Sequence, residues 1–190
     1  MPPSSSWTIV VPVKGTATAK SRFGDDERRL PLAEAMALDT VEAALAVAPV
    51  LVIGGVGLSS AFAALGASVM VEEPGDELNG AIARALATID GPAAVLLADL
   101  PALRPEELEP ALQDSVMVSD AEGTGTSLIT GRVPAFGAGS RDRHRALGYR
   151  ELDLPATSGL RLDVDSPEAL AAIPQERLGP RTLRLLRPGR

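Results

Sequence analysis

The sequence predicts an α/β protein, a single domain with a mostly parallel sheet and helices on both of its faces. Short β-branched and aliphatic runs alternate along the chain with Ala- and Leu-rich segments of helical spacing, an alternation typical of parallel sheets. The 190 residues suffice for one hydrophobic core, and no domain linker or internal repeat interrupts them. We therefore expect one domain over residues 7–190, preceded by a small, polar and disordered segment at 1–6.

The predicted elements follow in chain order. The first strand is the run Trp-Thr-Ile-Val-Val-Pro-Val at 7–13, and a helix over 32–47 follows Pro31, since proline suits the first turn of a helix. Further strands are expected at 50–53, 68–71, 93–97 and 115–119, and further helices at 58–65, at 79–89 and from Pro105. Beyond residue 120 the pattern becomes irregular, with Gly-rich loops of the kind that often bind ligands.

The composition excludes several kinds of chemistry. The chain has no cysteine, which excludes disulfides, thiolate catalysis and Cys-ligated metal sites. Its single histidine, His144, argues against multi-histidine metal sites and a Ser-His-Asp mechanism, and we expect it outside the chemistry. The net charge of -7 argues against a nucleic-acid partner, which usually meets a basic patch. The arginines at 177, 181, 184, 187 and 190 are typical of a solvated basic face.

Neither the first residues nor the hydropathy indicates export or a membrane. The run Met-Pro-Pro-Ser-Ser-Ser lacks the charged and apolar regions of a secretory signal. No apolar run reaches the roughly 18 residues that a membrane span needs. We expect a cytoplasmic protein that is a monomer or a homodimer.

Three aspartates stand where predicted strands end. Asp99 follows the run at 93–97, and Asp163 and Asp165 follow the Leu-Arg-Leu run at 160–162, which we expect to end another strand. Lys14 follows the first strand in the same way. Ligands of open α/β sheets bind outside the carboxyl ends of the strands, so these side chains are expected to share one site. Carboxylates there suit a hard divalent cation, and if that cation is Mg²⁺, a phosphate-bearing substrate becomes the leading expectation.

Two segments in the first half of the chain have two interpretations each. The segment 11–22 carries Lys14, Lys20 and Arg22, which suit either a loop around the phosphates of a nucleotide or a solvated basic loop. It lacks the residue order of a Walker A motif. Asn79 either caps the helix that it begins or points its amide at a base or ribose.

Glycine-rich segments offer backbone N–H groups. The Gly-Thr-Gly-Thr-Ser run at 123–127 suits a bound anion, with a plain turn as the alternative, and the Phe-Gly-Ala-Gly-Ser run at 136–140 resembles it. Ser140 is an N-cap candidate for a helix that carries Arg141, Arg143 and His144. The Gly-Val-Gly at 55–57 predicts a tight turn and not a dinucleotide site, because it follows the second strand and lacks a third glycine.

Together these segments resemble one family. The motifs, in the family's order, are Val11-Pro12-Val13-Lys14 with Ala19-Lys20-Ser21-Arg22, then Ala98-Asp99-Leu100-Pro101-Ala102-Leu103, Gly123-Thr124-Gly125-Thr126, Phe136-Gly137 with Ser140 and His144, and Asp163-Val164-Asp165-Ser166-Pro167. From Trp7 to about Leu186 the chain resembles the guanylyltransferases of coenzyme F420 biosynthesis, which use phosphoenolpyruvate or 2-phospho-L-lactate.

The resemblance implies a nucleotidyltransferase-type fold that uses Mg²⁺, GTP and a small phosphorylated three-carbon acid. By motif, the metal ligands would be Asp99, Asp163 and Asp165, which with Lys20 form the catalytic set. The nucleotide would lie near Asn79, with Lys20, or alternatively Lys14, and Arg22 at its phosphates. The phosphorylated acid would be held by Thr126, Gly137 and Ser140.

The identity of the acceptor stays open at this point. Actinobacterial relatives are thought to use phosphoenolpyruvate, and the Ala, Pro, Gly and Arg bias of the chain suggests a GC-rich genome, which favours that acid over 2-phospholactate or 3-phosphoglycerate. A noncatalytic nucleotide-binding regulator is the alternative of a different class, although a pure binder need not keep the acidic cluster. A molybdenum-cofactor guanylyltransferase should begin with a Leu-Ala-Gly-Gly type of loop, where this chain has Val-Pro-Val-Lys.

Overall fold

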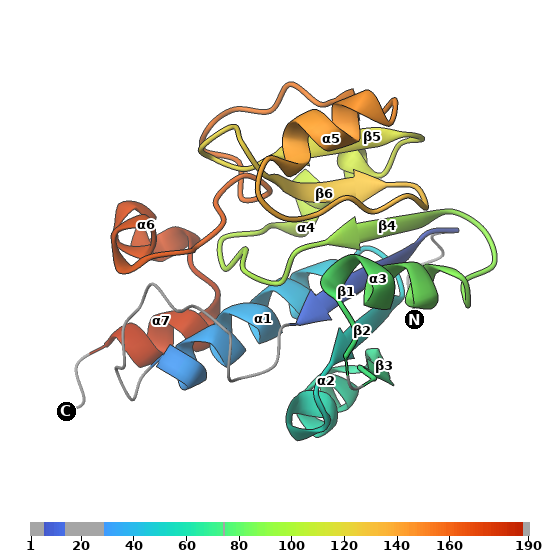
Figure 1. Ribbon diagram of the computed structural model, residues 1–190. Helices are drawn as coiled ribbons and strands as arrows, with labels where there is room; N and C mark the ends of the chain where they lie inside the picture. Colours follow the sequence, from blue (N-terminus) through green and yellow to red (C-terminus); the bar gives the residue numbers. More distant parts are fainter. Residues whose placement is uncertain (1–5, 14–28, 74, 188–190) are drawn as a thin grey trace.

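Seven strands form one sheet in the computed structural model, which describes residues 6–13, 29–73 and 75–187 (Figure 1). The strands are β1 (Thr8–Val13), β2 (Val50–Gly54), β3 (Ser68–Val71), β4 (Ala93–Leu96), β5 (Val116–Ser119), β6 (Thr126–Thr130) and β7 (Arg150–Glu151). Their spatial order is β3-β2-β1-β4-β6-β5-β7. The prediction of one mostly parallel sheet is confirmed.

The parallel part of the sheet comes from the first half of the chain. β1 pairs in parallel with β2 on one side and β4 on the other, and β2 pairs in parallel with β3. Ile9, Val10 and Val11 are fully buried, because both faces of this part of the sheet are covered, as parallel sheets require. The five strands predicted from apolar runs are all present, each within two residues of its expected bounds.

The second half of the sheet departs from the prediction. β6 lies antiparallel between β4 and β5, a strand that the sequence pattern did not indicate. Its sequence, Thr-Ser-Leu-Ile-Thr, has no strict alternation of polar and apolar residues, and all five residues are buried. The Gly-Thr-Gly-Thr run, whose last threonine begins β6, was expected to be a loop. The expected strand over residues 160–162 is wrong. These residues form a turn, in which the Arg161 N–H donates to the carbonyl of Ser158 at 2.9 Å.

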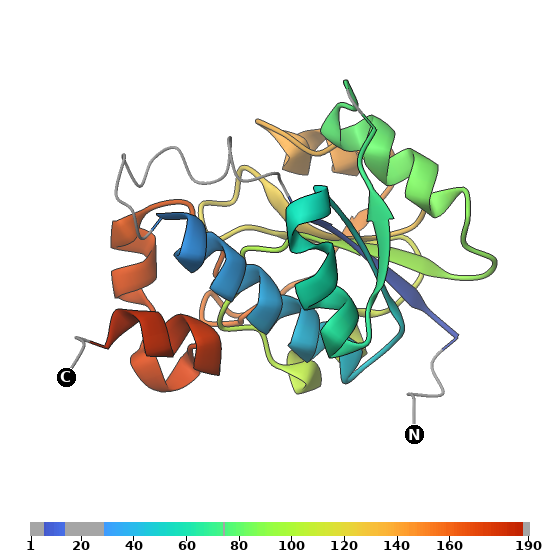
Figure 2. The ribbon, with the colours of Figure 1, turned by 90° about the horizontal axis from the view of Figure 1, so that it is seen from below.

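Helices cover both faces of the sheet, as predicted. They are α1 (Arg29–Leu45), α2 (Ser59–Leu65), α3 (Leu78–Leu86), α4 (Pro105–Leu108), α5 (Ser140–Ala146), α6 (Pro167–Ala172) and α7 (Pro180–Leu186), with 3₁₀ turns at Val56–Leu58, Glu109–Ala111 and Gln175–Arg177. One face packs against α1, α2 and α4 through side chains such as Val41, Phe62 and Leu108. The other face packs against α3 through Ile82 and Leu86. Figure 2 shows α1 and α2 side by side on the first face.

The carboxyl-terminal helix is attached to α1. The buried carboxylate of Asp39 accepts the backbone N–H groups of Arg181 at 3.1 Å and Thr182 at 2.8 Å, and so caps the first turn of α7. The Arg181 guanidinium reaches both Asp39 and Glu42, and Arg177 pairs with Glu107 at 3.1 Å. The expectation of a solvated basic face is therefore wrong for Arg177 and Arg181, which link elements. Of the helices described, none is long and apolar enough to cross a membrane.

Candidate functional site

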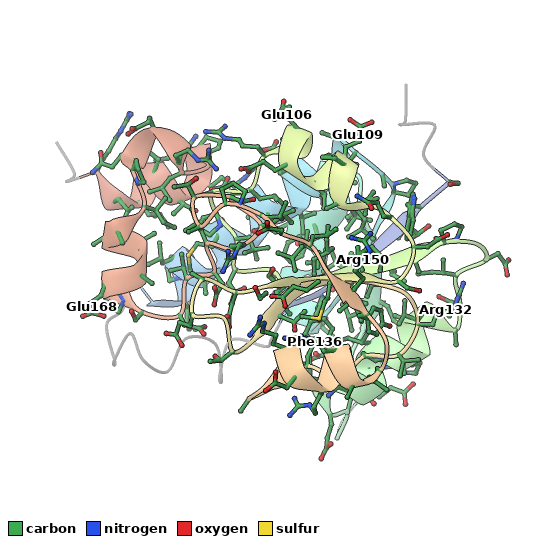
Figure 3. All side chains as sticks on the ribbon, turned by 90° about the horizontal axis from the view of Figure 1, so that it is seen from above. Glu106, Glu109, Arg132, Phe136, Arg150 and Glu168 are labelled. Atoms are coloured by element: carbon green, nitrogen blue, oxygen red, sulfur yellow. The ribbon has the colours of Figure 1, made fainter. Side chains whose placement is uncertain are left out.

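A cavity of about 520 Å³ opens at the carboxyl ends of β1 and β4, the edge where ligands of open α/β sheets bind. Its volume suits a nucleotide-sized ligand. Five of its lining residues are acidic: Asp99, Asp120, Glu122, Asp163 and Asp165. Another part of the wall is the segment that leads into α5, with Phe136, which Figure 3 labels beside this helix, Gly137, and Ser140 as the first helical residue. All three predicted metal ligands and all three predicted acceptor residues thus line one cavity.

Asp99 is held in place through its backbone. The Thr40 hydroxyl of α1 accepts the Leu100 N–H at 3.2 Å. Its single hydrogen has two acceptors within reach, the Met36 carbonyl at 2.8 Å and the Ala98 carbonyl at 3.2 Å. The carbonyl of Asp99 itself accepts the Val164 N–H at 3.0 Å. The bonds to the Leu100 N–H and to the Asp99 carbonyl fix the peptide group after Asp99 and place this residue beside the segment that carries Asp163 and Asp165.

Asp163 has a strongly altered acidity. Burial, followed by the negative charges of Asp99 and Asp120, raises the pKa of Asp163 to about 7, while a hydrogen bond from the Ala121 N–H opposes this shift. A carboxylate whose pKa is raised by its acidic neighbours is a position where a cation lowers the electrostatic energy. Asp165, two residues on, lines the same cavity and is exposed.

These carboxylates fit a cation that takes few protein ligands. Within the described residues, no three acidic or histidine side chains converge into a preformed metal cage. Mg²⁺ usually binds through one or two carboxylates, with phosphates of the substrate and water completing its shell. The acidic wall therefore suits a metal that arrives with a nucleotide, and suits a dedicated all-protein cage poorly.

Asp120 is a member of the acidic wall that the sequence analysis missed. Its carboxylate accepts the N–H groups of Thr124 at 3.0 Å and Gly125 at 2.7 Å, and so folds the Gly-Thr-Gly turn that leads into β6. A Cβ atom at Gly125 would collide with this carboxylate, which explains the glycine. The signal was available, because Asp120 directly follows the predicted strand that became β5, just as Asp99 follows β4.

The loop before α5 is held by the side chains of two residues, Asn79 and Arg143. The amide of Asn79 accepts the Phe136 N–H at 2.8 Å and donates to the Phe136 carbonyl at 3.0 Å. Arg143 donates to the carbonyls of Ala135 and Ala138, at 2.9 and 2.6 Å. The loop is therefore a rigid wall of the cavity.

Both capping expectations are wrong. The residue before α3 is Glu77, and Asn79 is the second residue of that helix, with its amide used on Phe136. The residue before α5 is Gly139, whose φ of 69° favours glycine, and Ser140 is the first helical residue. Asn79 lies behind the cavity wall, whereas its neighbour Leu78 lines the cavity. Lys14, Lys20 and Arg22 lie outside the described residues.

The α/β fold with an acidic cavity at the carboxyl edge of its sheet, together with relatives that are 40–46% identical, identifies the protein as a nucleotidyltransferase. Within this class the chain belongs to the family of CofC-like guanylyl transferases, whose model matches residues 7–138. A phosphoenolpyruvate guanylyltransferase of Streptomyces coelicolor is 46% identical over 93% of each chain. The enzyme of the same name from Streptomyces scabiei is 45% identical, over 96% of this chain and 99% of the relative.

Solved structures support the fold. A protein of Desulfovibrio desulfuricans G20, described as a nucleotide-diphospho-sugar transferase, aligns over 96% of this chain and 94% of its own, with a TM-score of 0.64 and 18% identity. Rv0371c of Mycobacterium tuberculosis H37Rv, solved as a complex with manganese, aligns over 88% of this chain and 96% of its own, with a TM-score of 0.54 and 19% identity. At these identities the likeness concerns the fold alone.

Proposed function

We propose that the protein transfers GMP from GTP to the phosphate of phosphoenolpyruvate and releases pyrophosphate. The observation that carries this proposal is the acidic cavity at the strand ends, found in a chain that is 46% identical to a phosphoenolpyruvate guanylyltransferase over 93% of its length. The product would serve coenzyme F420 biosynthesis, as the resemblance of the motifs implies. Location in the cytoplasm and a monomeric or homodimeric state remain predictions from the sequence.

The roles of the site residues follow from charge and position. We assign Asp99, Asp163 and Asp165 to a divalent cation, with Mg²⁺ as our choice, because these carboxylates line one cavity and burial with nearby negative charge raises the pKa of Asp163. The cation would neutralise charge on the triphosphate and on the departing pyrophosphate. Lys20, Lys14 and Arg22 keep their predicted role at the phosphates of the nucleotide.

The acceptor would lie against another part of the wall. Thr126, Gly137 and Ser140 line the cavity there and offer hydroxyl and backbone N–H groups, which suit the oxygens of a phosphorylated acid. One of its phosphate oxygens attacks the α-phosphorus of GTP, the new P–O bond forms, and the bond to the pyrophosphate oxygen breaks. That oxygen is anionic near pH 7, so the step needs no general base, and alignment with charge neutralisation supplies the rate.

The placement of the only histidine, His144, is consistent with a reaction that needs no general base. His144 is fully buried, and both of its ring nitrogens are engaged in hydrogen bonds, which leaves it unsuited to accept a proton from a substrate. A reaction without a general base agrees with that placement.

The acceptor test uses three acids in parallel. The purified protein is incubated with GTP and Mg²⁺ and, separately, with phosphoenolpyruvate, 2-phospholactate or 3-phosphoglycerate, and pyrophosphate release is measured. We expect the highest kcat/KM with phosphoenolpyruvate. A higher kcat/KM with another acid would show that this acid is the acceptor, with the same type of reaction. GTP binding without pyrophosphate release for any acid would favour the noncatalytic regulator.

A further inference from the structure

His144 is fully buried between two aromatic rings. Its imidazole meets the edge of Phe136 with ring centroids 5.0 Å apart and Tyr149 with centroids 5.5 Å apart. Phe136 belongs to the cavity wall, so the histidine lies directly behind that wall. A polar ring in such a place requires a hydrogen-bond partner for each nitrogen.

The partners of the ring determine where its proton sits. Nε2 accepts the backbone N–H of Ala135 at 2.9 Å, and since an amide nitrogen can only donate, Nε2 carries no hydrogen. The neutral ring must then carry its hydrogen on Nδ1, which lies 3.0 Å from the hydroxyl oxygen of Thr126. Burial and the charge of Arg143 lower the pKa of His144 to about 4, so the ring is neutral at physiological pH.

This tautomer sets the polarity of the Thr126 hydroxyl. Because Nδ1–H donates to the hydroxyl oxygen, the hydroxyl cannot donate back to the ring. Its own hydrogen is left for another acceptor, and among the described residues no side chain or carbonyl is recorded as receiving it. Thr126 lines the cavity, on the wall that we assign to the acceptor.

We propose that His144 is a positioning residue, which through its Nδ1–H tautomer makes Thr126 a hydrogen-bond donor toward an anionic oxygen of the phosphorylated acceptor. The same ring holds the Ala135 N–H and thereby the loop that carries Gly137 and Ser140. One histidine thus orients two parts of the acceptor wall. This inference rests on the proposed function, since it concerns the acceptor half of that site.

The tautomer can be observed directly, because the chain contains a single histidine. In ¹⁵N spectra of the labelled protein at pH 7 we expect one imidazole with a protonated Nδ1 and an unprotonated Nε2. An Nε2–H tautomer, or a mixture of both averaged by exchange, would overturn the inference. This measurement uses the wild-type chain without a substrate, so its result does not depend on the proposed function.

Two substitutions test the effect on the acceptor. His144→Gln offers an amide oxygen to the Ala135 N–H and lacks the Nδ1 donor, whereas Thr126→Val removes the hydroxyl. Each should raise the KM for phosphoenolpyruvate roughly tenfold or more, as expected for a lost hydrogen bond to a charged group. The KM for GTP should stay within about twofold. The double variant should be no worse than the poorer single variant, because both remove the same interaction.

Controls separate positioning from general damage to the wall. Tyr149→Phe loses the hydroxyl bonds to Val133 and keeps the ring against His144, so it should leave the KM for phosphoenolpyruvate unchanged. Equal increases in both KM values for His144→Gln, or additive effects in the double variant, would contradict the proposal. Calorimetric binding of phosphoenolpyruvate to wild type and His144→Gln repeats the comparison without turnover. If wild type binds phosphoenolpyruvate more tightly than His144→Gln does but neither protein releases pyrophosphate, the proposed reaction is refuted and this inference still holds.

Discussion

At the residue scale, the acidic wall depends on groups that hold its backbone. Thr40 is fully buried on α1, and its hydroxyl accepts the Leu100 N–H, directly after Asp99. The metal role that we propose for Asp99 requires a fixed position, and here a side chain from a different element holds the adjacent peptide group.

Replacing Thr40 tests this arrangement. Thr40→Val keeps the shape and leaves the Leu100 N–H without its acceptor, so we expect the free energy of unfolding to fall by about 1–3 kcal/mol and kcat to fall roughly tenfold or more. Urea unfolding and pyrophosphate release measure the two effects. Thr40→Ser should restore most of both.

The matched control is a second buried threonine. The hydroxyl of Thr182 makes no hydrogen bond to any described residue, so Thr182→Val should change stability by less than about 1 kcal/mol and leave turnover intact. Equal effects of the two substitutions would show that Thr40 has no special relation to Asp99.

His144 also makes stability depend on pH. Its pKa of about 4 in the folded protein lies below the ordinary value of 6.5, so the unfolded chain binds the proton more tightly. The contribution of His144 to the free energy of unfolding is therefore fully present above pH 6.5 and is lost as the pH falls toward 4. The loss between pH 6.5 and 5 should be about 1–2 kcal/mol.

The measurement is a comparison of urea unfolding at pH 6.5 and 5 for wild type and His144→Gln. Carboxylates titrate in both proteins, and only wild type has the histidine contribution. The advantage of wild type should shrink as the pH falls. An advantage that is constant or grows would contradict the assignment of a buried, neutral ring.

At the scale of elements, one buried carboxylate caps α7 and links it to α1. Asp39 accepts the N–H groups of Arg181 and Thr182, and a Cβ atom at Gly179 would collide with it. Because α7 packs on α1, which also carries Thr40, this attachment supports the helix behind the acidic wall.

Asp39→Ala should release α7. The loss of charge-assisted bonds at a buried site is expected to cost about 2–3 kcal/mol and to increase hydrogen exchange over 180–186. Glu42→Ala removes only the partly exposed partner of the same arginine and should cost less than about 1 kcal/mol. Similar exchange in both variants would mean that Asp39 does not hold the helix.

The elements also show how far the sequence could predict the structure. The parallel strands were predictable because each is a short apolar run followed by a helical segment, as β1 and α1 illustrate. β6 was not, because its threonines and serine are buried through hydrogen bonds to other segments, such as the bond from Thr130 to the Gln113 carbonyl. The pattern of polar and apolar residues within a short segment gives no information about hydrogen-bond partners in distant segments.

The same limit applies to the site. Asp99 was predictable from its place after β4, whereas Asp163 and Asp165 were found from a strand that does not exist. What places them is the long-range bond between Val164 and Asp99, which the sequence does not display. Asp120 was overlooked although the rule that found Asp99 applies to it equally.

At the scale of the whole molecule, the protein is negatively charged, its cavity is acidic, and the substrates that we propose for it are anions, so they repel one another. The net charge is -7, and five carboxyl-bearing residues line the cavity. A nucleoside triphosphate and a phosphorylated acid can meet there only if cations intervene. The carboxylates at the strand edge, with the cation that we propose they bind, are therefore the centre of the proposed reaction.

Pyrophosphate release by aspartate variants tests this claim most directly. With GTP, Mg²⁺ and phosphoenolpyruvate, Asp99→Asn and Asp163→Asn should each lose at least about 100-fold in kcat, with the cooperative unfolding of wild type preserved. Asp90→Asn is the control, since Asp90 is exposed and precedes β4, at the opposite end of the strand that leads to Asp99. It should behave as wild type. Near-normal turnover in Asp99→Asn and Asp163→Asn would contradict the account.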